Sequence, residues 1–348
     1  MQRAYRQLHG RSPRHDELLL ALGERCAGTQ RWERAIECFQ QVSEFDPELR
    51  ASAILQLGEI QIRQNDAVAA ESSFKTFLSL AAQLPETNSE QISTARHWLT
   101  FLDSAQLRYE ERQGTLEELL QDDQANVYDI KQRYFPNLLI WNSTLGRERN
   151  RDFLAMTPND PWINLAEVRY RLGEGRMEEA DALLSQLQDS PALGQHWLAV
   201  RLELDYELDD WRAMQQHLQQ FDRPGTNEPW LLLQMRGEAA LHREDWPEAI
   251  HHFEALLAAE PAHLSGHMGL ARALREQGNS TRADEAASQA KWLAKIRPEL
   301  SSLTEVNLQA ALDLADECEA HELIDTANSL RAYVTQQERR GQREGVRQ

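Results

Sequence analysis

Apolar residues recur at helical intervals in two neighbouring stretches of the chain. In residues 247–260, Ala249, Phe253 and Leu256 fall on one stripe of a helix, and acidic and histidine residues lie off that stripe. Residues 231–242 form a second run with helical periodicity, and only a short turn separates the two runs. The pattern therefore predicts two antiparallel helices, each of about a dozen residues.

The same pattern returns immediately afterwards. Residues 264–297 align with residues 230–263 at an offset of 34, so that Gly237 falls on Ala271. Self-similarity at a fixed period of this size indicates stacked structural repeats. A single helix hairpin cannot bury both of its faces, and stacking the next hairpin on it covers the face left open.

Similar spacing extends over much of the chain and predicts its organisation. The expected segments are 1–15, a partial repeat helix or an N-terminal cap; 16–84, two repeats; 85–158, a degenerate or irregular helical segment; 159–298, four repeats; 299–334, a C-terminal capping helix pair; and 335–348, a disordered tail.

The order of small, aromatic and proline residues within each unit resembles the tetratricopeptide repeat family. The resemblance implies an all-α fold, a right-handed α-solenoid of antiparallel helix hairpins with about six repeats in two blocks. It assigns the following positions to the repeat signature: Gly23, Trp32, Ala35, Phe39, Gly58, Ala70, Phe74, Ala166, Ala180, Trp211, Gly237, Trp246, Ala249, Phe253, Ala271, Gly278 and Ala283.

The resemblance also implies that the first helix of each hairpin lines a concave groove. One position on these helices, just after the Leu-Gly pair, would point into it, and it is occupied by Glu24, Glu59, Glu167, Glu203, Glu238 and Arg272. Tyr170 and Tyr206, one turn further on, would add amphipathic contact area. Such a series of carboxylates would attract a partner rich in Lys or Arg. The alternative is that glutamate occurs there only as a good helix former at an exposed site.

Composition narrows the range of partners. The 348-residue chain has a net charge of −19, which argues against nucleic acid and against an anionic membrane surface. It contains no apolar run of about 18 residues, so no membrane insertion is predicted. Three cysteines without a CxxC motif suggest a reducing, cytoplasmic location. An exported protein is the alternative, if the true N-terminus lies upstream of Met1.

No arrangement of residues in the sequence predicts catalysis. His263 and His267 have the spacing of two helical metal ligands, but no HExxH motif accompanies them and no third ligand is indicated. No phosphate-binding loop or nucleophile motif occurs, and no cofactor or metal is predicted. The sequence therefore predicts a non-enzymatic scaffold that binds a basic or amphipathic protein segment in an acidic groove.

An alternative follows from the start of the chain. Pro13 precedes Pro47 by 34 residues, and Tyr5 and Leu8 fall in the same register as the second helix of a repeat. On this interpretation the chain is an accessory repeat segment of a larger protein or complex whose catalytic or membrane part lies elsewhere. No oligomeric state is predicted.

Overall fold

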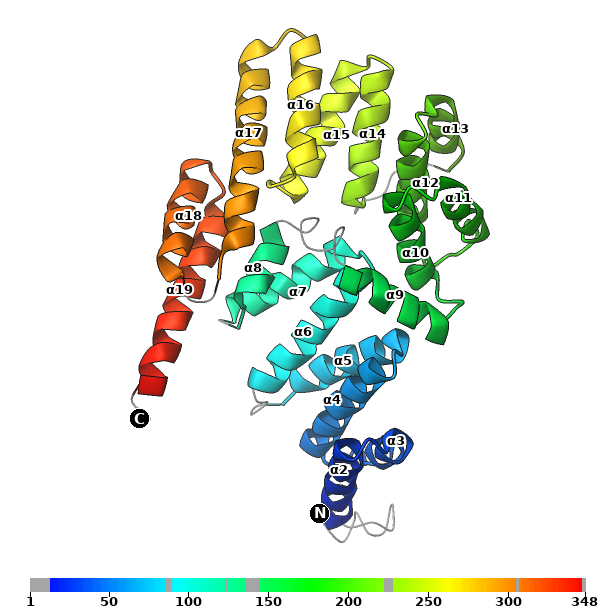
Figure 1. The fold of residues 1–348 in the computed structure, drawn as a ribbon, viewed down its shortest axis with the longest axis vertical. Helices are drawn as coiled ribbons and strands as arrows, with labels where there is room; N and C mark the ends of the chain where they lie inside the picture. Colours follow the sequence, from blue (N-terminus) through cyan, green and yellow to red (C-terminus); the bar gives the residue numbers. More distant parts are fainter. Residues whose placement is uncertain are drawn as a thin grey trace. The chain divides into compact units, whose positions relative to one another are not determined.

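The computed structural model describes residues 13–84, 89–122, 124–134, 144–221, 228–304 and 307–345. Within these ranges the regular structure consists of eighteen helices, with no strand (Figure 1). The helices are α2 (Pro13–Gly28), α3 (Trp32–Gln40), α4 (Pro47–Arg63), α5 (Ala67–Ala81), α6 (Ser89–Ala105), α7 (Tyr109–Gln121), α8 (Val127–Tyr134), α9 (Thr144–Met156), α10 (Pro161–Gly173), α11 (Met177–Gln186), α12 (Gln195–Glu207), α13 (Trp211–Phe221), α14 (Trp230–His242), α15 (Trp246–Ala259), α16 (Leu264–Glu276), α17 (Ser280–Ser302), α18 (Leu308–Ala320) and α19 (Ile324–Gly345).

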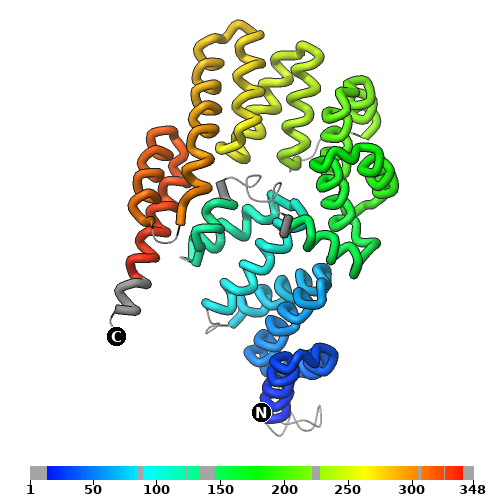
Figure 2. Tube along the Cα trace, viewed as in Figure 1, coloured from blue at the N-terminus to red at the C-terminus, as the bar shows by residue number. Residues whose placement is uncertain are grey.

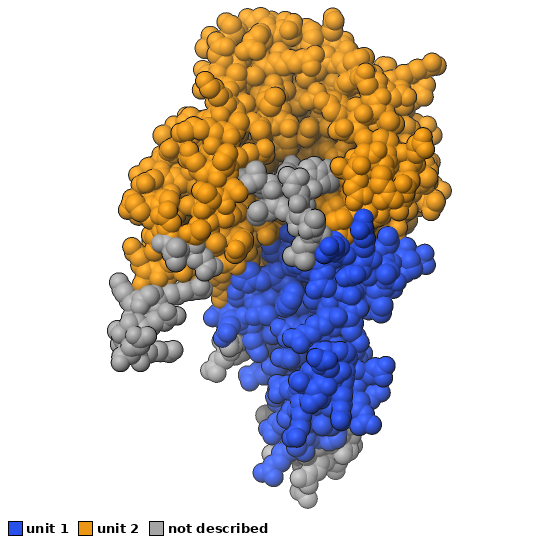
Figure 3. Space-filling view, in the orientation of Figure 1, with its two compact units in different colours: residues 1–106, 148–160 blue, residues 107–147, 161–348 orange. Residues whose placement is uncertain are grey.

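The chain divides into two compact units. Unit 1 comprises residues 1–106 and 148–160, and unit 2 comprises residues 107–147 and 161–348 (Figure 3). The segment predicted as one degenerate region, 85–158, is therefore shared between them, with α6 in unit 1 and α7 and α8 in unit 2. None of the described helices is both long enough and apolar enough to cross a membrane.

Unit 1 is built around two hairpins, α2–α3 and α4–α5, whose helices meet at glycines. A Cβ atom at Gly23 would lie 2.4 Å from the ring of Phe39, and one at Gly58 would lie 2.7 Å from the ring of Phe74. Both rings are buried. The glycine in the first helix thus leaves the space that the aromatic ring of the second helix fills. The next helix continues the stack, since Trp98 of α6 stacks on Phe74 with ring centroids 6.4 Å apart.

Short polar sequences end one helix and start the next within several hairpins. The cap residues Asp66, Asp245 and Asn279 each accept a hydrogen bond from the backbone N–H three residues later. The residue before each cap has a positive φ, of 61° at Asn65, 59° at Glu244 and 90° at Gly278. Asparagine and glycine tolerate this left-handed conformation well, which explains their use in these turns.

In unit 2 the successive hairpins run from α10 to α17 and then to α18 and α19, as the trace in Figure 2 shows. The pair predicted most clearly, α14–α15 and α16–α17, packs around Phe253, which is 0% exposed. Its ring would lie 2.6 Å from a Cβ at Gly237 in its own hairpin and 2.2 Å from a Cβ at Gly269 in the next. Phe253 therefore joins two consecutive hairpins as well as the helices of one.

The C-terminal segment corrects two expectations. Helix α17 continues through Pro298 to Ser302, beyond the predicted end of its repeat. Helix α19 extends to Gly345, so the disordered tail predicted from residue 335 is wrong for 335–345. Tyr333 and Val334 are buried in the core formed with α17 and α18, and this core holds α19 in place. The Gln, Glu and Arg residues that follow are good helix formers, so the helix continues without an apolar stripe.

Residues 1–12 and 346–348 lie outside the described residues. The interpretation of Tyr5 and Leu8 as part of an earlier repeat helix concerns that segment, and it remains a prediction. Within the described chain, α2 begins at Pro13, a residue that suits the first turn of a helix.

Candidate functional site

The eight residues predicted to line a groove all lie on the first helices of hairpins. In unit 1 they are Glu24 on α2 and Glu59 on α4. In unit 2 they are Glu167 and Tyr170 on α10, Glu203 and Tyr206 on α12, Glu238 on α14 and Arg272 on α16.

The two acids of unit 1 are available to solvent. Glu24 is exposed and Glu59 is partly exposed on the neighbouring first helix, and α2 packs against α4. Among the described residues neither carboxylate forms an ion pair. These two carboxylates are therefore accessible, and their contact with a partner stays a prediction.

Glu167 does not face solvent. It is 3% exposed, and its carboxylate accepts hydrogen bonds from Arg147, with Nη2–Oε1 at 2.9 Å, and from Nε of Arg171, also at 2.9 Å. Burial alone would raise the pKa of Glu167, but the bonds from Arg147 and Arg171 outweigh it and lower the pKa. Arg147 also donates to Glu174. The expectation that Glu167 contacts a partner is wrong, because internal arginines already satisfy it.

Glu203 is also paired within unit 2. Arg169 binds both of its oxygens, with Nε–Oε2 at 3.0 Å and Nη2–Oε1 at 3.1 Å. Arg169 precedes Glu203 by 34 residues, so this ion pair links neighbouring hairpins one repeat apart. Burial would lower the pKa of Arg169, yet the charge of Glu203 reverses this and raises it. Glu203 therefore joins consecutive hairpins and is not a free carboxylate.

Tyr170 belongs to the same internal network. It is buried, the guanidinium carbon of Arg147 lies 5.3 Å from its ring centroid, and it packs with Leu107 and Tyr109 just before and at the start of α7. Burial raises the pKa of its hydroxyl. Its predicted role as an exposed contact for a partner is therefore wrong.

The remaining three positions stay accessible. Tyr206 is 37% exposed and packs edge-on against Trp211, with ring centroids 5.6 Å apart. Burial raises the pKa of Glu238, and the charge of Arg272 opposes that shift. Glu238 and Arg272 both influence the pKa of Tyr206 as well, which burial raises. Tyr206, Glu238 and Arg272 thus form a mixed polar cluster on α12, α14 and α16.

Nothing in the sequence indicates Arg147 as the partner of Glu167. Arg147 lies in α9, within the part of the chain where no repeat spacing is found. Repeat spacing identifies which face of a helix a residue occupies. It cannot show which side chain from a non-repeating segment lies opposite, so the pair of Arg147 with Glu167 was missed.

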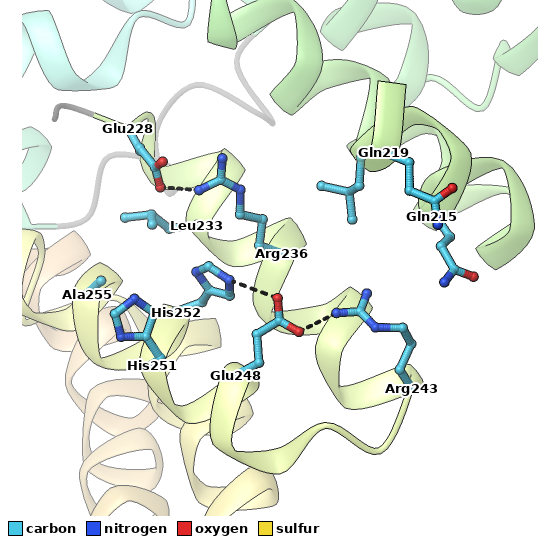
Figure 4. A pocket seen from close by; sticks show the side chains of 11 residues that line it. Gln215, Gln219, Glu228, Leu233, Arg236, Arg243, Glu248, His251, His252 and Ala255 are labelled. Carbon is cyan, nitrogen blue, oxygen red and sulfur yellow. Dashed lines mark hydrogen bonds and ion pairs between the residues drawn. The ribbon is translucent and has the colours of Figure 1, made fainter. Parts of the chain in front are cut away.

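A cavity of about 620 Å³ lies between α13, α14 and α15 (Figure 4). Its cationic side chains face carboxylates of the cavity itself. Arg236 pairs with Glu228, Arg243 approaches Glu248 at 2.5 Å, and His252 lies 3.8 Å from Glu248. Burial lowers the pKa of His252, as does the nearby Arg236. The charges of the cavity are therefore balanced internally.

His263 and His267 have structural roles at the start of α16. The Nδ1 atom of His263 accepts a hydrogen bond from the backbone N–H of Gly266 at 3.1 Å, which caps the helix. His267 Nε2 lies 2.9 Å from the carbonyl oxygen of Pro261. In the part of the chain that the structure describes, no group of three or more His, Cys, Asp or Glu side chains is placed to hold a metal ion.

The cap at His263 predicts a loss of stability in acid. Burial, then Arg297 and His267, lower the pKa of His263 to about 4, from 6.5 in the unfolded chain. The unfolded state therefore binds a proton more readily, and folding loses up to about 3 kcal/mol as the pH falls through this interval. Urea unfolding between about pH 7 and pH 4 should show a weaker acid dependence for His263→Asn, because asparagine caps helices without titrating. Equal acid dependence of the two proteins would contradict this assignment.

Comparison with known proteins agrees with the geometry of α14–α17. Residues 235–298 match the tetratricopeptide repeat family. The matched region contains Gly237, Phe253 and Gly269, whose close packing joins the two hairpins. Residues 235–298, which form most of α14–α17, are thus a tetratricopeptide repeat segment. The all-α fold of stacked helix hairpins expected for the family is confirmed in the described residues.

Several solved structures are similar to this chain. A tetratricopeptide repeat protein from Parabacteroides merdae has 15% identity and a TM-score of 0.36, over 75% of this chain and 99% of its own. The human IFIT1 dimer with m7Gppp-AAAA has 14% identity and a TM-score of 0.41, and the match covers 90% of this chain and 75% of that one. Yeast Tom70 has 15% identity and a TM-score of 0.32, and the match covers 84% of this chain and 61% of that one. None of the curated proteins compared with the chain matches it.

Tetratricopeptide repeat folds serve in general as protein-interaction scaffolds, and such scaffolds are typically non-catalytic. The family and the fold therefore indicate a protein that binds other proteins. The kind of partner depends on the surfaces that the hairpins leave accessible.

Proposed function

We propose that this protein is a non-enzymatic scaffold that binds a basic or amphipathic protein segment at the acidic positions of its first helices. The observation that supports this most directly is the exposure of Glu24 and Glu59 on α2 and α4, without an ion pair to any described residue. In unit 2, Tyr206 and Glu238 offer a second accessible contact of amphipathic character. Glu167 and Glu203 are not part of the proposed surface, since arginines of the chain occupy them.

The charge of the chain supports the same class of partner. A net charge of −19 attracts Lys- and Arg-bearing segments over distances comparable with the Debye length and repels phosphate backbones. We therefore propose protein ligands rather than nucleic acid. Cys26, Cys38 and Cys318 are buried free thiols, which suits the reducing cytoplasm that we propose as the location.

Reversing the charge in unit 1 tests the proposal. We expect the double variant Glu24→Lys/Glu59→Lys to lose most of its capture of protein partners, because two attractive charges become repulsive at the contact. Capture by the purified chain, followed by mass spectrometry, measures the loss. Capture by the natural chain should also weaken as salt rises from about 0.05 M to about 0.5 M, where exposed charges are screened.

A matched control separates local charge from total charge. The double variant Glu33→Lys/Glu37→Lys changes the net charge by the same amount, at exposed positions on the second helix of the first hairpin, α3. This control should retain its partners, and circular dichroism should show unchanged helix content in both variants. Equal capture by the two variants would exclude α2 and α4 as the binding surface.

A further inference from the structure

Helices α7 and α8 lie on the inner side of the curve that α10 to α19 form within unit 2 (Figures 1 and 2). This is the side on which a tetratricopeptide repeat scaffold offers its first helices. The two helices contact this curve at three places: near α10 and α12, at α14 and α15, and at α17 to α19. Each contact is described in turn, because their chemistry differs.

The first contact is aromatic and cationic. The ring of Tyr109, the first residue of α7, lies 5.4 Å from the guanidinium carbon of Arg169 and is buried beside Tyr170. Arg169 is the residue that binds Glu203. Tyr109 therefore covers two of the positions at which a partner was expected, Tyr170 and the ion pair of Glu203.

The second contact consists of hydrogen bonds from α7 to α14 and α15. The Oε1 atom of Glu110 accepts from the backbone N–H of Trp230 at 2.8 Å. Trp230 is the first residue of α14, a helix whose N-cap residue, Pro229, provides no side-chain cap. Gln113 donates from Nε2 to Oε2 of Glu260 at 3.2 Å, just after α15. Glu110 thus places a negative charge at a helix N-terminus, where charge of that sign is stabilised.

The third contact is more apolar. Val127 and Ile130 of α8 are buried in the core formed by α17, α18 and α19. Lys131 donates from Nζ to the carbonyl oxygen of Ser301 at 2.8 Å. The apolar side chains Leu116 and Leu119 of α7 form a small cluster with Ala125, and Leu120 packs against both this cluster and the core of α17, α18 and α19. Helix α7 therefore meets α14 and α15 through polar bonds, and the apolar anchor at α17 to α19 comes from α8 together with Leu120 of α7.

Hydrogen bonds of this kind contribute little net stability, because water or an equivalent ligand can form the same bonds when the helix leaves. We propose that α7 is an internal occupant of the inner surface of unit 2, and that a partner helix with an aromatic residue followed by a carboxylate displaces it. The pair Tyr109-Glu110 shows the chemistry that this surface accepts: an aromatic ring at Arg169 and Tyr170, and an acid at the start of α14. This inference rests on the proposed scaffold function and adds regulation to it.

The test uses the full-length chain and a fluorescent peptide with the sequence of residues 107–134. In the natural protein its own α7 competes with the peptide, so binding is weak. The variant Glu110→Ala/Gln113→Ala loses the bonds to Trp230 and Glu260, so we expect it to bind the peptide about tenfold more tightly. The variant Glu111→Ala, which alters the exposed neighbouring residue on α7, should behave as the natural chain does.

Hydrogen exchange provides the second measurement. In Glu110→Ala/Gln113→Ala the amides of α7 should exchange at least about tenfold faster, while those of α14–α17 keep the protection of the natural chain. The inference is overturned if α7 exchanges only together with α14–α17, or if the peptide binds the three proteins equally or binds none of them. The variant Glu24→Lys/Glu59→Lys tests a different surface, on α2 and α4, and a basic partner. A failure of the proposed scaffold function is therefore distinguishable from a failure of the inference about α7.

Discussion

Replacing Phe253 with alanine is expected to lower the free energy of unfolding by about 3–5 kcal/mol. The ring is fully buried and fills the space between Gly237 of its own hairpin and Gly269 of the next. Both glycines lack a side chain that could move into the gap, so the cavity cannot close easily. The loss should therefore fall at the high end for an aromatic residue.

Urea unfolding followed by circular dichroism measures this change. Phe45→Ala provides the control, because Phe45 is about half exposed and its removal should cost about 0.5 kcal/mol or less. If both substitutions lower the free energy of unfolding by the same small amount, Phe253 does not join the α14–α15 and α16–α17 hairpins as described. A reduced slope of the transition would indicate that the array no longer unfolds as one cooperative body.

Charge reversal at Glu167 is expected to destabilise the fold by about 3–5 kcal/mol. The substitution Glu167→Lys places a third cation beside Arg147 and Arg171 in a buried site and removes the carboxylate that both of them contact. Arg147 keeps only Glu174 of its two acidic partners. Differential scanning calorimetry and urea unfolding both report the loss.

The matched substitution is Glu24→Lys, at the equivalent position of the first hairpin. Glu24 is exposed, so this change should alter stability by about 0.5 kcal/mol or less. A neutral effect of Glu167→Lys would mean that this carboxylate is accessible, and it would restore the uninterrupted acidic groove suggested by the repeat spacing. The two variants thus distinguish a structural glutamate from a surface glutamate at one repeat position.

Local sequence patterns were reliable where each unit repeats. The apolar runs at 231–242 and 247–260 predicted α14 and α15 to within about one residue at either end. The small and aromatic positions of the repeat also fell where the helices meet, as at Gly58 and Phe74. Helical periodicity is a local property, so it survives in the sequence without knowledge of the rest of the fold.

Contacts between helices were less predictable than the helices themselves. Gly269 was not singled out, although it approaches Phe253 more closely than Gly237 does. Residues 107–134 show no repeat spacing, so nothing in the sequence placed Tyr109 beside Arg169 or Glu110 at the start of α14. The continuation of α19 past residue 335 was not predicted either, because its last residues have no apolar stripe.

The sequence by itself determined that this protein contains a series of helix hairpins and where several of them begin and end. It also showed that one repeat position on the first helices is acidic in five of six hairpins. Only the tertiary structure decided which of those acids remain accessible. Repeat spacing is set by short-range periodicity, whereas the state of a carboxylate depends on the charges brought to it from elsewhere. Arg147 and α7 arrive at the first helices of unit 2 through the path of the whole chain, and Arg169 of α10 reaches Glu203 across neighbouring hairpins.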